Sequence, residues 1–267
     1  MLPGVYVAEK KDKTIYYRSN ITFSGKHISL GSFDTEEKAH LAYKEAEALL
    51  YGTTSLDDLL TAPEGFLSFD KKITLLNFRD NHMYIATPIY LHKNYFSYFF
   101  SPNEELKFDI DDLFYYSSHK ILRRKGHLFV NDYGLQTSIL SRYGIKAHGV
   151  SGRDYEFVNG DPSDFRYSNI KVINPYYGVA RIEKNGQVKY RTKIHIEGNY
   201  TIGTYSSETK AAIAYNKAVD LAKAAGIQKN YPENYIDAIP AKEYADIYTK
   251  VKISPNFLEY LSSLQSN

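Results

Sequence analysis

An internal repeat constrains this chain more than any other feature of its sequence. Residues 4–50 and 178–226 share one residue pattern, and aligning them needs only one-residue length changes in the two hairpin turns. A repeated pattern of this length predicts two copies of one small supersecondary unit. Ten positions match: Gly4, Tyr17, Arg18, Ile21, Gly25, Gly31, Phe33, Ala39, Ala42 and Tyr43 correspond to Gly178, Tyr190, Arg191, Ile194, Gly198, Gly203, Tyr205, Ala211, Ala214 and Tyr215.

Each copy has the pattern of three short strands followed by a helix. β-Branched and aromatic residues alternate with polar ones between turn sequences such as Asn-Gly and Ser-Gly. Asp34 or Thr35 marks the helix start in the first copy, with Glu37 placed for a capping box, and Ser206 or Ser207 marks it in the second. Residues at helical spacing then predict a helix face that lies close against the sheet. They are Ala39, Ala42, Tyr43, Ala46 and Leu49, and Ala211, Ala214, Tyr215, Ala218 and Leu221.

Strand alternation assigns a polar row to the free face of each sheet. If Tyr17, Ser19 and Ile21 point at the helix, the intervening side chains point away from it. Such a row suits a sheet laid in the major groove, because Arg reads guanine, Asn reads adenine, and Lys or Thr binds phosphate. A solvated sheet face explains the same pattern equally well. The candidate contacts are Arg18, Asn20 and Thr22 in the first copy, and Arg191, Lys193, His195, Asn199 and Thr201 in the second.

Four short motifs follow one another in both copies. In the first copy they are Gly4-Val5, Tyr17-Arg18-x-x-Ile21, Leu30-Gly31-x-Phe33 and Ala39-x-x-Ala42-Tyr43. In this order they resemble the plant Apetala-two/ethylene-response-factor DNA-binding domain and its phage relatives. The resemblance covers almost all of each repeat, and it implies that the three-stranded sheet docks in the major groove. The chain departs from the family in the first strand, where arginines usually face DNA but Tyr6 to Ala8 and Ala180 to Ile182 stand here.

A second pattern occupies residues 135–174, between the repeats. Its last part, residues 158–170, runs Val-Asn-Gly-Asp-Pro-Ser-Asp-Phe-Arg-Tyr-Ser-Asn-Ile. This resembles the close of the HNH motif of homing and phage nucleases, in which an Asp-His pair precedes an Ile-(Asp/Asn)-Gly-Asn turn and an Asp-Asn-Arg-x-x-Asn-Leu helix start follows. The resemblance implies a ββα unit with a His general base and one divalent cation at the leaving phosphate.

The residues at the catalytic positions depart from that motif. Glu156-Phe157 stands at the position of the general base, and Phe neither accepts a proton nor binds a metal. Gln136 or Thr137 stands where an earlier His is expected. We therefore expect catalysis to be lost and no cofactor to be required. If the nuclease is active, His148 is the candidate base, and the candidate ligands for Mg²⁺ are Asp154, Asp161 and Asp164.

Other polar residues of the centre have weaker assignments. The Asn-Gly-Asp-Pro-Ser-Asp run is equally ordinary turn and cap chemistry. Arg123 and Arg124 are candidates for phosphate contact, although a charge run is more typical of a solvated turn. Arg166 is a candidate DNA contact, but a structural role is the preferred interpretation for both Arg166 and Asn169.

The segment after the second repeat predicts one helix around Ala241 to Lys250. Tyr244, Ile247, Tyr248 and Val251 fall on one side of it. Such a stripe is typical of packing on the helix's own domain, and homodimerisation through this tail is the alternative.

Composition excludes some classes of protein and site. The chain has no Cys, so a disulfide framework and a thiolate zinc finger are excluded. No apolar run approaches the roughly 20 residues that span a bilayer, and the start lacks the apolar region of a signal peptide. We expect a cytoplasmic protein of a bacterial or phage-infected cell, without a membrane partner. The formal net charge of +2 decides little, so the case for DNA depends on where the cations lie.

Together these patterns predict an α+β protein. Its expected parts are a first module at 1–62, a degenerate HNH-like ββα-containing domain at 63–176, a second module at 177–230 and a helical tail at 231–267. The expected function is sequence-specific binding of double-stranded DNA by a phage or mobile-element transcriptional regulator derived from an HNH homing-type endonuclease. The alternatives are an active metal-dependent DNA endonuclease and a protein-interaction module.

Overall fold

The computed structural model describes residues 1–61 and 64–265, and within them the protein is a mixture of small antiparallel sheets and helices. The α+β prediction is confirmed at this level. The chain divides into two compact units, and each contains one copy of the repeat. The first consists of Met1–Thr137 and Asp161–Asn169, and the second of Ser138–Gly160 and Ile170–Asn267. The boundaries of the four parts expected from the sequence stay predictions.

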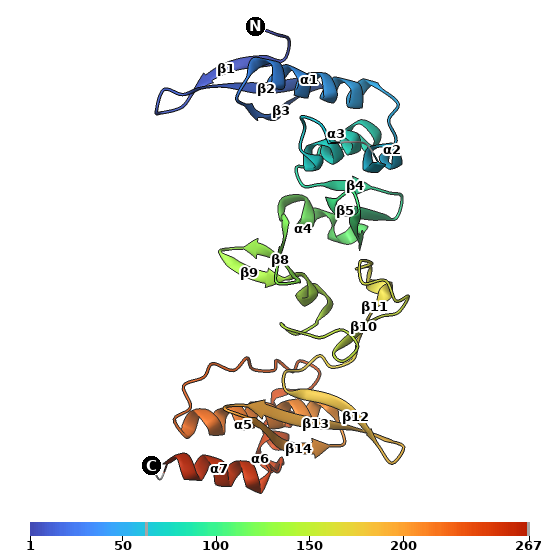
Figure 1. The fold of residues 1–267 in the computed structure, drawn as a ribbon. Coiled ribbons are helices and arrows are strands. Elements are labelled where there is room, and N and C mark those ends of the chain that lie inside the picture. Colours follow the sequence, from blue (N-terminus) through green and yellow to red (C-terminus); the bar gives the residue numbers. More distant parts are fainter. Residues whose placement is uncertain (62–63, 266–267) are drawn as a thin grey trace. The chain divides into compact units, whose positions relative to one another are not determined.

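The first repeat forms a three-stranded antiparallel sheet with one helix along one of its faces (Figure 1). Of the two expected caps, Thr35 is the N-cap, and its side chain accepts a hydrogen bond from the Lys38 backbone N–H. The small residues at helical spacing, such as Ala42, are fully buried, so the helix lies close to the sheet. The elements are β1 (Val5–Glu9), β2 (Ile15–Phe23), β3 (Lys26–Phe33) and α1 (Glu36–Tyr51).

The second repeat forms the same unit. Ser207 caps its helix by accepting a hydrogen bond from the Lys210 backbone N–H. The buried Thr192 hydroxyl donates to the Ala211 carbonyl at 2.9 Å and so ties the middle strand to the first turn of the helix. The elements are β12 (Val179–Lys184), β13 (Gln187–His195), β14 (Asn199–Tyr205) and α5 (Glu208–Ala224).

The two copies also share an irregularity in the middle strand. A β-bulge interrupts the pairing of β2 with β3 between Ser19 and Asn20, and a bulge interrupts the pairing of β13 with β14 at the equivalent step. The Asn20 N–H donates a hydrogen bond to the Gly4 carbonyl at 3.0 Å, and the Lys193 N–H donates one to the Gly178 carbonyl at 2.8 Å. The two copies therefore share this backbone hydrogen bond in addition to their strands and helix.

The matched Gly and Tyr residues contact each other in both modules. Gly4 and Gly178 have φ angles of 76° and 69°, in the region that favours glycine. A Cβ atom at Gly4 would lie 2.0 Å from the ring of Tyr43, and one at Gly178 would lie 2.2 Å from the ring of Tyr215. Each tyrosine of the helix thus packs directly on the backbone where the first strand begins.

Further elements extend each module. In the first unit α3 packs on α1, and the apolar core runs from Ile21 through Leu49 and Leu76 to Phe99. The remaining elements up to residue 138 are α2 (Leu56–Thr61), α3 (Phe69–Asn81), β4 (Ile89–Leu91), β5 (Tyr95–Ser101), β6 (Glu104–Asp109), η1 (Ile110–Asp112), α4 (Leu113–Ser118), β7 (Ile121–Arg124), β8 (His127–Asp132) and β9 (Leu135–Ser138).

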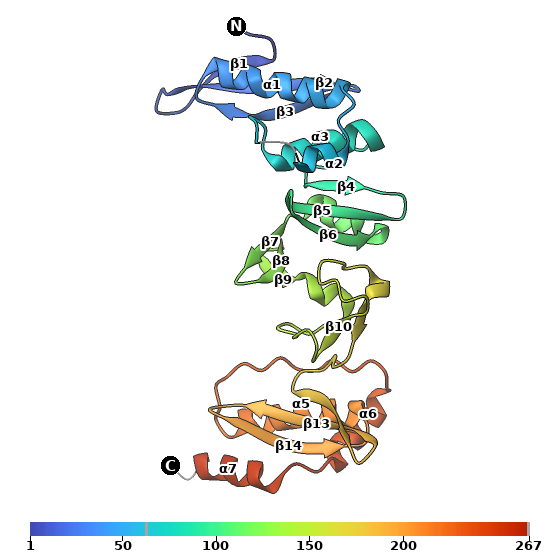
Figure 2. The ribbon, with the colours of Figure 1, turned by 45° about the vertical axis from the view of Figure 1, so that its right-hand side comes forward.

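The tail of the second unit packs on its own module. The helix α6 (Ala241–Lys250) has the expected bounds, and its Tyr248 hydroxyl donates to Asp220 of α5 at 2.8 Å. Helix α7 (Pro255–Gln265) lies beside β14 (Figure 2), where Phe257 joins the apolar core. The packing of the tail on its own domain is confirmed, whereas homodimerisation stays a prediction.

The segment that resembles the HNH motif contains little regular structure. It comprises η2 (Ile139–Tyr143), β10 (Tyr155–Phe157), the one-turn η3 (Tyr167–Asn169) and β11 (Ile170–Val172), and β10 pairs with β11. The α-helix that the resemblance implies after Asp164 is absent from this described segment. The buried Asn169 amide donates to the Asp164 carbonyl at 2.8 Å and closes a single turn, so the backbone passes straight into β11.

The close contact between Gly4 and Tyr43 predicts a large effect of one methyl group. Gly4→Ala should lower the free energy of unfolding by about 2–4 kcal/mol, from backbone strain and overpacking together. Gly25→Ala is the matched control, because Gly25 has the same φ of 76° and no atom within 4 Å of its Cβ position. It should cost only the strain of about 1–2 kcal/mol. Urea denaturation followed by far-ultraviolet circular dichroism measures both, and equal losses would contradict the packing argument.

Candidate nucleic-acid interface

The alternation expected for the middle strands is present. Ser19 and Thr192 are fully buried beneath the helices, whereas Arg18, Arg191 and Lys193 are exposed on the opposite face. Since a sheet covered on one side by a helix presents its other side to solvent, each module has one open face. The remaining candidates are Asn20, which is half-buried, and Thr22, His195, Asn199 and Thr201, which are exposed.

On the first module two of the candidate side chains are paired with neighbouring side chains of the same module. The Arg18 guanidinium donates to the Tyr16 hydroxyl at 2.8 Å and lies 5.5 Å from the centre of that ring. The Thr22 hydroxyl and His27 Nδ1 are 3.0 Å apart. Tyr6 of β1 stands opposite Arg18 in the sheet. This face therefore offers one arginine among tyrosine and hydroxyl groups.

The second module offers more cations on the same face. Lys193 stands opposite Thr201, and His195 stands opposite Asn199, with His195 Nδ1 3.2 Å from Asn199 Oδ1. Within the described part of the chain, neither the Arg191 nor the Lys193 side chain has a hydrogen-bond or ion-pair partner inside the protein. Both are available to a ligand.

Arg191 and Lys193 line a cavity of about 570 Å³, which we call the cationic cleft. The loop before β10 and the segment after α5 line it too, and both belong to the second unit. Among its described lining residues, five are Lys or Arg and only Asp154 is acidic. Low-dielectric walls lined by one sign of charge concentrate the field inside a cleft, so it attracts anions. Its basic lining residues are Lys146, Arg153, Arg191, Lys193 and Lys229, with His148 and His195 beside them.

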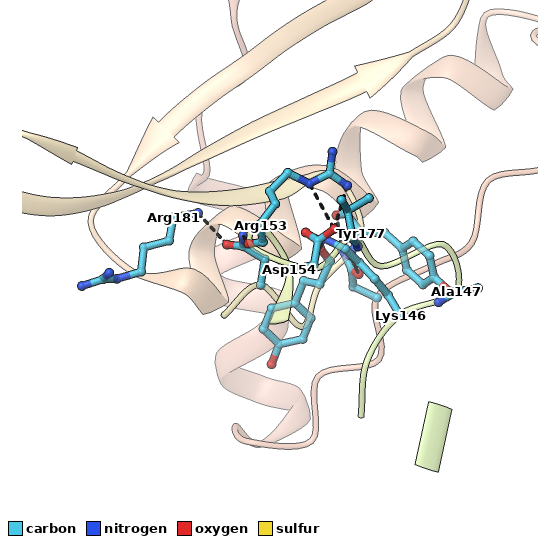
Figure 3. Close-up of polar contacts among 10 residues, drawn as sticks. Lys146, Ala147, Arg153, Asp154, Tyr177 and Arg181 are labelled. Atoms are coloured by element: carbon cyan, nitrogen blue, oxygen red, sulfur yellow. Dashed lines mark hydrogen bonds and ion pairs between the residues drawn. The ribbon is translucent and has the colours of Figure 1, made fainter. Parts of the chain in front are cut away.

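Asp154 is the centre of a buried ion-pair cluster (Figure 3). Its side chain is 2% exposed. One carboxylate oxygen lies 2.9 Å from Lys146 Nζ, while the other accepts from Arg153 Nε at 3.0 Å and Nη2 at 2.7 Å. Burial by itself raises the pKa of Asp154, but the hydrogen bonds from Arg153 and Lys146 outweigh it and hold that pKa below its ordinary value. The carboxylate is thus ionised and neutralised by its neighbours.

The same loop is tied to the start of the second module. Lys146 Nζ donates to the Tyr176 carbonyl at 3.0 Å, and the Ala147 N–H donates to the Tyr177 hydroxyl at 3.1 Å (Figure 3). The Asp154 carbonyl accepts from the Asn174 N–H at 3.0 Å. Three contacts to residues 174–177 therefore fix one wall of the cleft against the strand that follows.

The first module has a hollow at the equivalent place but with different chemistry. Its volume is about 430 Å³, and its lining includes Gly4, Asn20 and Tyr43, the counterparts of Gly178, Lys193 and Tyr215. Among its described lining residues there is no Lys or Arg, and Glu47 contributes a negative charge. The cationic cleft is consequently a property of the second copy and does not follow from the shared fold.

The three candidate metal ligands are held by other groups. Asp154 binds the two cations described above, Asp164 accepts from Arg166 Nε at 2.8 Å and Nη2 at 2.6 Å, and Asp161 accepts from the Ser163 N–H at 2.9 Å. Asp161 and Asp164 belong to the first unit and Asp154 to the second. Within residues 1–61 and 64–265, no three His, Asp or Glu side chains are arranged to hold a metal ion. All three carboxylates therefore have partners within the protein.

The other candidates of the centre are placed as follows. Arg166 is engaged by Asp164, and Asn169 closes the adjacent turn, as their preferred structural roles require. Arg123 forms an ion pair with Glu104 and lies 4.8 Å from the centre of the Phe100 ring. Arg124 is exposed at the end of the hairpin strand β7.

The residues that stand at the catalytic positions of the HNH motif contact other side chains of the protein. Glu156 of β10 forms an ion pair with Lys171 of β11 at 2.7 Å. Phe157 packs edge-on against Tyr155, with 5.6 Å between ring centres. His148 is exposed, has a φ of 63° and lines the cationic cleft. Its role as a general base stays a prediction.

Three cationic residues of the cleft were not among the sequence-based candidates: Lys146, Arg153 and Lys229. Each lies more than 30 residues from Arg191 in the chain, and no periodicity connects them. The only indication is compositional, since Lys146 and Arg153 flank a turn with two glycines inside the HNH-like segment.

Comparison with known protein families, with curated proteins and with solved structures finds no match to this chain. In the described part of the chain, no helix has both the length and the apolar character needed to cross a membrane.

The Asp154 cluster generates a prediction about stability. Asp154→Asn leaves the almost buried ammonium of Lys146 without its counter-charge, and breaking a buried pair in this way costs about 3–5 kcal/mol. Because the folded-state pKa is depressed, the native carboxylate stabilises the fold above pH ~4 and this contribution is lost as pH falls through the folded pKa. The variant should lack that acid-sensitive part of the stability.

Glu156→Gln is the matched control in the same unit, because its ion pair with Lys171 is exposed. It should change stability by at most about 1 kcal/mol. Urea denaturation of both variants between pH 3 and pH 7 makes the comparison, and a small effect of Asp154→Asn would show that the cluster is not a stabilising element.

Proposed function

We propose that this protein binds double-stranded DNA in a sequence-specific manner and acts as a transcriptional regulator of a phage or mobile element. The observation that carries the proposal is the open sheet face of the second module. Within the described part of the chain, the Arg191 and Lys193 side chains have no hydrogen-bond or ion-pair partner, and both line a cleft whose described lining holds five Lys or Arg residues and one carboxylate.

The proposed mode of binding follows from the dimensions of the two partners. The major groove is about 12 Å wide and admits β-strands lying along it. With the sheet in the groove, Arg191 is suited to guanine, and the hydrogen-bonding groups of Asn199 and Thr201 extend the row that faces the bases. Lys193 and the cations of the cleft are suited to phosphates, which position the protein without reading sequence.

The distribution of charge supports DNA over a protein partner. The whole chain carries a formal net charge of only +2, yet the cationic cleft gathers basic residues from three separate segments of one unit. Concentrated positive charge is the electrostatic feature expected of a phosphate-binding surface. The resemblance of both modules to the Apetala-two/ethylene-response-factor domain agrees with this assignment.

The same considerations favour a binding protein over a nuclease. The general-base position carries Glu156-Phe157, and Glu156 is paired with Lys171. Each candidate metal ligand already has a cationic or hydrogen-bonding partner within the protein. We therefore propose that the central segment descends from an HNH homing-type endonuclease and has lost catalysis.

The proposal is tested by selection from a random duplex pool at low and at physiological salt, with Mg²⁺ present. Bound DNA is recovered, resolved on a denaturing gel and sequenced. Intact DNA enriched in a bipartite motif supports a sequence-reading regulator with two modules. Enriched but nicked DNA contradicts the loss of catalysis. Absence of enrichment overturns the proposal and favours the protein-interaction module.

The second module should contribute more affinity than the first. Arg191→Ala combined with Lys193→Ala should weaken binding to the selected duplex severalfold, because two unpaired cations are removed from the face. Arg18→Ala should weaken it less, since Arg18 is already bound to Tyr16 and is the only Lys or Arg among the three candidates on its face. Fluorescence anisotropy with the selected duplex measures both, and a larger loss for Arg18→Ala would reverse the assignment of the dominant face.

A further inference from the structure

We propose that Arg153 binds a backbone phosphate of the duplex read by the second module, and that Asp154 is the residue that positions it. This inference rests on the proposed DNA-binding function. It assigns a ligand class, the phosphodiester group, to the loop of residues 146–154, which lies outside the sheet.

The geometry of Arg153 suits a fixed phosphate contact. Its side chain is 61% exposed although its carboxylate partner is buried. Asp154 accepts hydrogen bonds from Nε and Nη2 of Arg153. Within the described part of the chain, Nη1 of Arg153 has no partner. A guanidinium held along one edge keeps its remaining N–H groups in a known direction, so less side-chain entropy is lost when a phosphate binds.

Asp154 does not cancel the attraction of the cleft for anions. Its charge is shared between Lys146 at 2.9 Å and Arg153 at 2.7 Å, so the three groups together keep one positive charge. Lys146 is 9% exposed and also donates to the Tyr176 carbonyl, which makes it an internal counter-ion. The free positive charge is therefore the one on the exposed guanidinium of Arg153.

The size and position of the cleft determine which part of a DNA duplex can enter it. A volume of about 570 Å³ is that of a small-molecule site, far too small for a duplex. The cleft also reaches Lys193 and Lys229, and Lys229 is fixed by a 2.9 Å bond to the His195 carbonyl. Cations on both walls suit a phosphodiester segment that passes between them while the bases face the sheet.

The first module serves as an internal comparison. Its equivalent hollow contains Glu47 and, among its described lining residues, neither Lys nor Arg. The two copies share one backbone fold, yet only the described lining of the second hollow contains Lys and Arg. The phosphate contact is expected at the half-site bound by the second module and not at the other.

The test compares Arg153→Ala with Arg181→Ala by anisotropy, using the selected duplex and a random duplex over a range of salt concentrations. Arg181 is an exposed arginine of β12 in the same unit, does not line the cleft, and points away from the Asp154 cluster (Figure 3). Loss of one phosphate contact should reduce the slope of log K against log salt by about 0.9. Arg153→Ala should therefore lower the affinity for both duplexes by the same factor at low salt and leave the sequence preference unchanged. Arg181→Ala should bind both duplexes as wild type does.

Arg153→Lys separates charge from positioning. It keeps the positive charge but cannot form the two-nitrogen contact with Asp154. It should retain the wild-type salt slope and bind more weakly than wild type. Circular dichroism confirms that each variant is folded before its affinity is compared.

The outcomes separate this inference from the function on which it rests. Wild-type protein that selects no DNA overturns the proposed function. Wild-type protein that selects DNA, with Arg153→Ala unchanged in affinity and slope, overturns the phosphate contact alone. An equal loss for Arg181→Ala, or a changed sequence preference in Arg153→Ala, also overturns it, because a backbone contact at this site predicts neither.

Discussion

The packing of a tyrosine ring on a glycine backbone is the contact on which both modules depend. Tyr43 on Gly4 and Tyr215 on Gly178 hold each helix close to its sheet, and the positive φ at each glycine directs the first strand into place. Because the helix covers one sheet face, alternate side chains of the middle strand are buried and the others are left in solvent. The open face of each sheet is thus a direct consequence of how the core is closed.

A shared core does not give the two copies a shared surface. The bulge after Ser19 recurs after Thr192, yet the residue that follows it is Asn20 in one copy and Lys193 in the other. The loop of residues 146–154 then adds cations beside the second copy only. The buried positions of the pattern are those that set the fold, whereas exposed positions differ between the copies and give the two faces different charge.

The parts of the structure that were predictable from sequence are those set by local rules. The strands, the caps at Thr35 and Ser207 and the outward direction of Arg18 and Arg191 follow from alternation, turn residues and hydrogen-bonding capacity within short segments. The helix implied by the HNH resemblance did not form, because a buried Asn169 closes one turn instead. The cationic cleft was unpredictable for a related reason: it joins Arg153 to residues some 40 positions away through tertiary packing, and periodicity carries no information about such contacts.

Holding an arginine in place and holding a metal ion make opposite demands on a carboxylate such as Asp154. A metal ligand must direct a charged oxygen into an open coordination site, whereas Asp154 directs both oxygens at ammonium, guanidinium and backbone N–H groups inside the protein. A carboxylate neutralised in this way has little remaining attraction for a cation, but it orients the arginine that it holds. The same buried negative charge therefore fixes the exposed guanidinium of Arg153 at the cationic cleft.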